Sequence, residues 1–260
     1  MTAQPDAVEP TVNLLETELA VRYALHEAGA DLGEPIDIKF GGQRPASVAV
    51  AGIVSSNDRK QQLLGALSGI PHVVAQLQTE EETLQHERRI SVTRAEPRIV
   101  AARSPIEIEL LAYFGDPSAV ETFSRKAVAL TEGLMSHAWA LRHLSERYSA
   151  LESKDDSALS LSSRQLLQIM RRDHYRTMFD AAAELTTLMS PILRSISDSP
   201  VESVAKLPLF DSTQQVQRLT LDLLSGSRSS DASGHTLPAK AAEDLLISLR
   251  GLESTLEDQR

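Results

Sequence analysis

The chain has no cysteine, which excludes disulfide bonds, cysteine-ligated zinc, iron–sulfur clusters and cysteine nucleophiles. Aromatic residues make up only 4% of it, and the abundance of leucine and alanine favours helices over a large sandwich or barrel. No stretch approaches the roughly 18 to 20 uninterrupted apolar residues that a membrane helix requires. Acidic residues outnumber basic ones, so the formal net charge is −10. Such a chain is not typical of a general nucleic-acid binder or of a protein that adheres to anionic membranes.

The amino-terminal residues 1–11 are polar and contain no lysine or arginine, so they lack the basic start and apolar core of a secretory signal. We expect this end to be disordered and the chain as written to be cytoplasmic. It would be periplasmic if it is the soluble part of an anchored protein, and membrane association would then need a segment outside this chain. The length of 260 residues corresponds to about one or two domains.

Residues 12–79 show the patterns of a small α/β unit. Apolar residues recur at helical spacing before Gly29, and two stretches of alternating apolar residues flank a glycine-rich turn, which predicts a β-hairpin. A second helix follows, and either Ser55 or Ser56 can cap it. The order is helix, strand, strand, helix, strand, and we expect both helices to cover one face of the sheet. The expected elements lie at 12–30, 36–40, 47–51, 58–68 and 73–77.

Within this unit, one set of residues follows the pattern of a known family of small domains. These residues are 48–55, 58–59, 63–64, 67 and 69–73. In this pattern the unit resembles the BON family, and the resemblance implies a non-enzymatic module of the bacterial envelope that contacts proteins, its own copies or phospholipids. The motif residues here are Gly52, Gly69 and Val73. We interpret the two glycines as bulge or helix-cap positions rather than as ligand contacts.

Residues 80–103 carry mixed charges with weak periodicity, which predicts a short helix or strand followed by a linker between two domains. After them, Ser104-Pro105-Ile106-Glu107 has the pattern of a capping box with proline at the first helical position. Gly115 and Asp116, followed by Pro117, predict the end of that short helix and the cap of the next one.

Residues 104–260 are expected to form a helical domain. Long apolar seams predict helices over 117–149 and from about 161 to 192, joined by a polar loop into an antiparallel hairpin, bundle or coiled coil. Asp211 predicts the cap of a further helix, and the serine-rich segment 225–237 is typical of a mobile loop. We expect a final helix over 238–258 to pack on the bundle or to pair with another chain.

Two histidines interrupt the apolar seams of the predicted hairpin. His137 and His174 lie symmetrically about the loop midpoint near residue 155.5, so an antiparallel hairpin places them face to face, with Asp173 close by. They could form a pH-sensitive pair or supply two ligands of a metal site. The alternative is a structural pair of partly buried histidines, satisfied by water or backbone. Because a metal needs further ligands that the spacing does not supply, we predict no metal and no cofactor.

Ser203 and Lys206 match the S-x-x-K pattern of enzymes in which a lysine amine deprotonates a serine nucleophile. The companion K-T-G and S-D-N motifs are absent from the sequence, as are the G-x-S-x-G elbow and the glycine-rich phosphate loops. A serine hydrolase is therefore only a remote alternative, and we expect no enzyme activity. Trp139 and Phe123 lie at helical spacing, and we expect both to be core residues.

The overall layout also resembles the soluble region of membrane-anchored anti-sigma-factor-like regulators. The chain departs from that family because it has neither the Cys/His zinc segment nor a membrane helix, which argues against direct sigma-factor binding. We predict a non-enzymatic binding or regulatory module of the bacterial cell envelope, with a protein partner and without nucleic acid. The first alternative is a self-associating scaffold or secretion-associated ring module, which would use the edge of the strand at 73–77.

Overall fold

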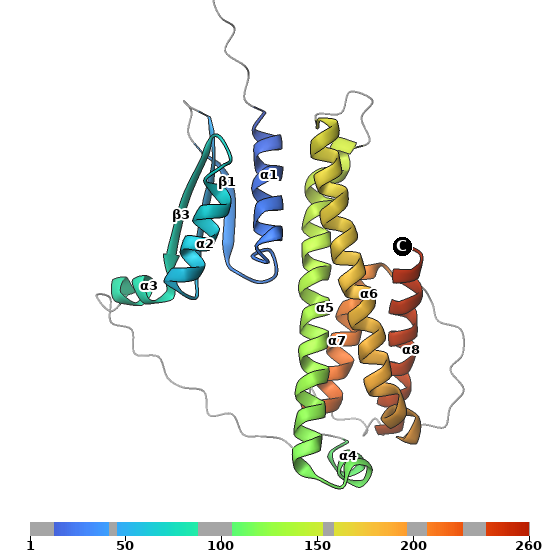
Figure 1. Cartoon of the computed structure of the whole chain (residues 1–260). Helices are drawn as coiled ribbons and strands as arrows, with labels where there is room; N and C mark the ends of the chain where they lie inside the picture. Colours follow the sequence, from blue (N-terminus) through green and yellow to red (C-terminus); the bar gives the residue numbers. More distant parts are fainter. Residues whose placement is uncertain are drawn as a thin grey trace, which may run out of the picture. The chain divides into compact units, whose positions relative to one another are not determined.

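The structure is a computed structural model that describes residues 13–41, 46–87, 106–152, 159–196, 207–225 and 238–259. It combines one three-stranded sheet with a set of helices (Figure 1), which confirms the predicted α+β class. The chain divides into two compact units, residues 1–93 with 148–170 and residues 94–147 with 171–260. None of the helices in the described ranges combines the length and the apolar character that crossing a membrane would need.

The amino-terminal part follows the predicted order of helix, strand, strand, helix, strand. Strands β1 and β2 pair antiparallel, β2 and β3 pair parallel, and the sheet order is β1-β2-β3. The hairpin prediction is thereby confirmed, and β3 forms one edge of the sheet. A short helix follows β3 directly, as one of the two options for this stretch predicted. The elements are α1 (Leu14–Glu27), β1 (Ile36–Gly41), β2 (Ser47–Val54), α2 (Asn57–Leu67), β3 (Val73–Thr79) and α3 (Glu80–Glu87).

Helices α1 and α2 cover the same face of this sheet. Val48, Val50 and Val54 of β2 are directed to that face, because side chains alternate along a strand. These residues pack against apolar side chains of both helices, and burying each of them contributes about 1.5–3 kcal/mol. The buried core consists of Val21, Leu25, Ala30, Val48, Val50, Val54, Leu63, Leu67 and Leu77.

The turns of this unit show which polar and glycine residues shape it. The Ser56 hydroxyl accepts a hydrogen bond from the amide of Arg59 at 3.2 Å, so Ser56 rather than Ser55 caps α2. Gly29 has φ +64° directly after the C-cap residue Ala28, where a left-handed glycine commonly ends a helix. Gly69, which follows the C-cap residue Ser68 of α2, does not have a positive φ. His72, just before β3, adopts φ 62°. The left-handed residue of this turn is therefore a histidine, not the expected glycine.

Gly52 lies within an unbroken ladder instead of at a bulge. It pairs with Ile36 on β1 and with Leu77 on β3. A Cβ atom at this position would lie 2.7 Å from the Pro35 carbonyl oxygen and 3.0 Å from the Ile36 Cα. The interpretation as a bulge is wrong, and the requirement for glycine here is close approach of the neighbouring backbone.

The carboxyl-terminal part is helical, as predicted. Helices α5 and α6 run past each other in opposite directions and α7 and α8 pack beside them (Figure 1). The final helix contributes six buried residues to the common core of the helices. It therefore packs on the bundle, which is one of the two predicted arrangements. The helices are α4 (Glu107–Phe114), α5 (Pro117–Glu152), α6 (Leu161–Ile196), α7 (Leu209–Ser225) and α8 (Pro238–Glu257).

Two contacts fix the register between α5 and α6. The Lys126 Nζ lies 2.7 Å from the Glu184 Oε1, and the His137 Nδ1 lies 2.9 Å from the His174 Nδ1. In each pair the two residues are equally far along the sequence from a midpoint at about residue 155. This is the geometry of an antiparallel hairpin with the predicted midpoint, and it confirms that prediction.

The helix ends differ from prediction in two places. Helix α4 begins at Glu107 with Ile106 at the cap position and without a side-chain cap bond, so the predicted capping box is not seen; Ser104 and Pro105 lie outside the described residues. Helix α7 begins at Leu209, so Asp211 lies in its first turn instead of capping it. A carboxylate in the first turn still stabilises the helix, because it lies near the positive end of the helix dipole.

The junction of α4 and α5 agrees with prediction. Gly115 ends α4 with φ +69°, and the Asp116 Oδ1 accepts a hydrogen bond from the Ser118 amide at 3.1 Å. Other expectations fall on residues that the structure does not describe. They are the expected disorder of residues 1–11, most of the expected linker at 80–103 and most of the expected loop at 225–237.

Candidate protein-interaction edge

Strand β3 offers an open row of backbone hydrogen-bonding groups. Within the described part of the chain it pairs with β2 on one side and with no strand on the other. The His72 carbonyl accepts a hydrogen bond from the Val48 amide at 2.8 Å, so the backbone groups of residue 72 point toward β2. These groups alternate in direction along a strand. The N–H and C=O groups of Val73, Ala75 and Leu77 therefore point to the open side.

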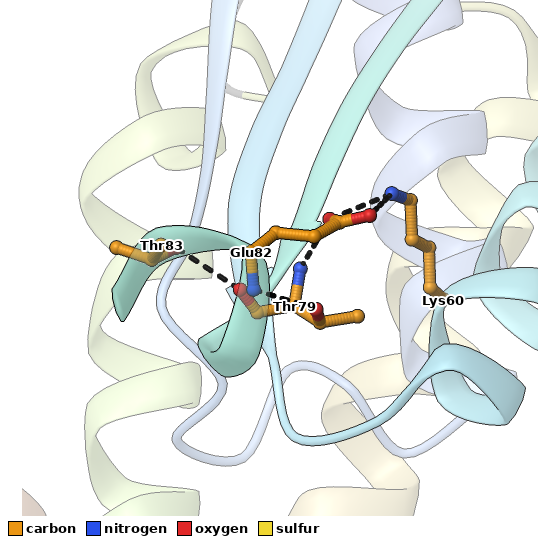
Figure 2. A network of polar contacts seen from close by, with 4 residues as sticks. All are labelled: Lys60, Thr79, Glu82 and Thr83. Carbon is orange, nitrogen blue, oxygen red and sulfur yellow. Dashed lines mark hydrogen bonds and ion pairs between the residues drawn. The ribbon is translucent and has the colours of Figure 1, made fainter. Parts of the chain in front are cut away.

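The next outward-pointing backbone group, the Thr79 amide, already has a side chain as its hydrogen-bond partner. The Thr79 amide donates a hydrogen bond to the Glu82 Oε2 at 2.8 Å, and the Glu82 amide donates to the Thr79 Oγ1 at 3.2 Å. These reciprocal bonds form a capping box at the start of α3 (Figure 2). The open edge consequently ends at Leu77.

Lys60 holds the Glu82 carboxylate in this position. Its Nζ lies 2.9 and 2.8 Å from the two carboxylate oxygens of Glu82 (Figure 2). The hydrogen bond from Lys60, followed by that from the Thr79 amide, lowers the pKa of Glu82 below its ordinary value of 4.5. The T-x-x-E pattern of residues 79–82 is the local sequence signal for this box.

The composition of β3 does not protect its edge. The strand has the sequence VVAQLQT, without a charged residue or proline, and the Val74 side chain is 47% exposed. Natural edge strands usually carry lysine, proline or a bulge that discourages pairing with another chain. Strand β1, at the opposite edge, carries Asp37 and Lys39, which form an ion pair with each other. Of the two edges, β3 is the one suited to receive another strand.

The predicted histidine pair is present in the helical part. The His137 and His174 rings lie with centroids 5.2 Å apart and planes inclined by 62°, and their Nδ1 atoms are 2.9 Å apart. His174 is 1% exposed, whereas His137 is half-buried. A hydrogen bond between two Nδ1 atoms needs one as donor and the other as acceptor. The two Nδ1 atoms therefore approach each other across the hairpin, as its symmetry predicts.

The remaining site residues from the sequence are placed as follows. Val73 begins β3 and belongs to the open edge. Ser203 and Lys206 lie outside the described residues. Asp173 precedes His174 on α6, and its carboxylate lies 3.5 Å from the Arg172 Nε.

One expected core residue lies at the surface. Phe123 is 4% exposed, as predicted for the core, but Trp139 is 45% exposed and the expectation for it is wrong. Its ring packs edge-on against Phe210 of α7, with centroids 4.6 Å apart. The Arg142 guanidinium lies over the Phe210 ring, 4.5 Å from its centroid. An aromatic residue at helical spacing can thus pack on a neighbouring helix without being buried.

Comparison of the chain with protein-family models, with curated proteins and with solved structures found no match.

Proposed function

We propose that this chain is a non-enzymatic protein-interaction module in which the β3 edge receives an extended segment of a protein partner. The observation that carries the proposal is the outward row of backbone groups at Val73, Ala75 and Leu77, on a strand without protective charge. Strand addition uses such groups for affinity, and pockets for alternate side chains for specificity.

The BON-like pattern of residues 48–73 supports the same proposal, because that family consists of binding modules. With it we propose a regulatory or scaffolding role at the bacterial cell envelope. A serine hydrolase is the weaker alternative, and the described residues do not test it. The serine–lysine pattern at 203–206 falls outside them.

The test compares three forms of the full chain as bait in a bacterial envelope extract, to which untagged chain is added. One form is the wild type, one carries Val74→Lys with Gln76→Lys, and one carries Ala51→Lys. The double variant adds charge to the edge strand, which disfavours pairing. Ala51 lies beside Gln76 on the central strand, so its variant adds charge near the edge without changing β3.

We expect the wild type and Ala51→Lys to retain a protein, either untagged chain or an extract component, that the double variant loses. Circular dichroism verifies that all three forms fold equally. The proposal is wrong if the wild type retains no protein above background. It is also wrong if all three forms retain the same protein equally.

A further inference from the structure

We infer that the segment received by β3 is β3 of a second copy of this chain, paired antiparallel about a two-fold axis at Ala75. This inference rests on the proposed function, because it names the partner of the same edge. A two-fold arrangement uses the same surface on both copies and closes both open edges at once. It would join two three-stranded sheets into one continuous sheet.

The charges at the end of β3 decide the direction of pairing. Glu80 and Glu81 follow the strand directly, and Glu82 after them is already paired with Lys60. Parallel pairing of two copies would bring these carboxylates beside their counterparts, and like charges placed opposite each other are destabilising. Antiparallel pairing instead sets them beside the other copy's turn at residues 69–72, Gly-Ile-Pro-His, which contains no acidic residue.

The positions of the open backbone groups decide the register. Residues that exchange hydrogen bonds across an antiparallel pair must both direct their backbone groups to the shared edge. The open residues Val73, Ala75 and Leu77 are centred on Ala75. With Ala75 opposite Ala75 of the second copy, Val73 lies opposite Leu77 of the second copy, and every open group finds a partner.

The two neighbouring registers each lose hydrogen bonds. A shift that sets Val73 opposite Thr79 of the second copy requires the Thr79 amide, which already donates to Glu82. The opposite shift sets Leu77 against Pro71 of the second copy, and proline has no N–H to donate. Only the register centred on Ala75 avoids both losses.

The side chains on the outer face are compatible with this register. It places Val74 opposite Gln76 of the second copy, at a pair that does not exchange hydrogen bonds. Cβ atoms at such pairs are about 4.5–5.5 Å apart or closer, so the exposed Val74 would be covered by the aliphatic stem of the glutamine. On the helix-covered face the axis brings together two alanines, whose small side chains leave room for close approach.

The absence of native cysteine allows a direct test of register. We would prepare the full chain with Val74→Cys and, separately, with Gln76→Cys, and oxidise each alone and as an equimolar mixture. In the inferred register residue 74 meets residue 76 of the other copy but never its own counterpart. We expect the mixture to give at least ten times more disulfide-linked dimer than either variant alone. A mixture of Val74→Cys with Ala51→Cys is the matched control.

Sedimentation equilibrium of the cysteine-free chain provides the second readout. We expect a monomer–dimer equilibrium that Val74→Lys with Gln76→Lys shifts to monomer and that Ala51→Lys leaves unchanged. Cross-linking of Val74→Cys alone, or of Gln76→Cys alone, as strongly as the mixture would overturn the register. A wild-type chain that stays monomeric, together with a mixture of the two cysteine variants that does not cross-link, would overturn the second copy as partner.

The outcomes separate this inference from the proposed function. If the wild-type chain is monomeric, captures an extract protein and no longer captures it in the double lysine variant, strand addition at β3 stands. Pairing of β3 with a second copy is then wrong. A dimer that persists unchanged in the double lysine variant contradicts β3 pairing altogether.

Discussion

The Nδ1 atoms of His137 and His174 lie 2.9 Å apart across helices α5 and α6. Two imidazole nitrogens at this distance share one proton, so one ring donates and the other accepts. With Lys126 and Glu184 they show the register between helices α5 and α6. The pair thus acts in holding the hairpin together, and its two members should be energetically coupled.

Replacing either histidine by alanine should destabilise the helical part. We expect His137→Ala to lower the free energy of unfolding by about 1–2 kcal/mol, for a lost hydrogen bond. His174→Ala should lower the free energy of unfolding by more, about 2–4 kcal/mol, because removing this fully buried ring also leaves a cavity. A double-mutant cycle in urea should give a coupling of about 0.5–1.5 kcal/mol, and additive effects would show that the contact contributes nothing. ¹⁵N chemical shifts should reveal one ring with a protonated Nδ1 and one without.

Two glycines in the amino-terminal unit should respond oppositely to alanine. Gly52→Ala would force its Cβ to within 2.7 Å of the Pro35 carbonyl oxygen, and we expect a loss of about 1–3 kcal/mol. A Cβ on Gly65, in α2, meets no atom within 4 Å. Gly65→Ala should therefore stabilise the unit by about 0.5–1 kcal/mol through helix propensity. Thermal or urea unfolding measures both, and a neutral Gly52→Ala would contradict the close packing of β1 on β2.

The Glu82 carboxylate should make stability depend on acidity. Its pKa is lowered in the folded chain, so its contribution is fully present above the unfolded value near 4.5 and is lost as pH falls through the folded pKa. Lys60→Met removes the largest cause and should raise the pKa of Glu82 toward 4.5. A carboxyl ¹³C titration measures this change. Lys39→Met, which removes an exposed lysine on β1, should leave the Glu82 titration unchanged.

The single tryptophan reports on the packing of α7 against α5. Phe210→Ala removes the ring that packs edge-on against Trp139. We expect a red-shifted emission and a stability loss of about 1–3 kcal/mol. Ile108→Ala, at a side chain that is 80% exposed, should change neither property appreciably. An unchanged emission in Phe210→Ala would show that the two rings are not in contact.

Local sequence patterns were sufficient for the elements and their approximate bounds. Apolar spacing predicted α5, α6 and α8, and alternation with a glycine-rich turn predicted the hairpin of β1 and β2. Hairpin symmetry also predicted that His137 faces His174. These features depend on interactions between near neighbours or on a single turn, which is why periodicity reveals them.

Other features depended on contacts that no local pattern specifies. The exposure of Trp139 follows from the side of α5 on which α7 packs. The need for glycine at residue 52 follows from the approach of β1, and the ion pair between Lys60 and Glu82 follows from the packing of α2 near α3. Each combines residues distant in the chain, and apolar spacing carries no information on their distance.

The sequence by itself determined the α+β class, the order of the elements and the antiparallel pairing of the long helices, because apolar periodicity and turn residues encode them locally. Tertiary structure alone decided that β3 lies at the edge of the sheet, whereas the local T-x-x-E pattern of residues 79–82 ends its open backbone groups at Leu77. Sheet order is a long-range property set by which strands pair, and this pairing leaves one side of β3 available to a partner.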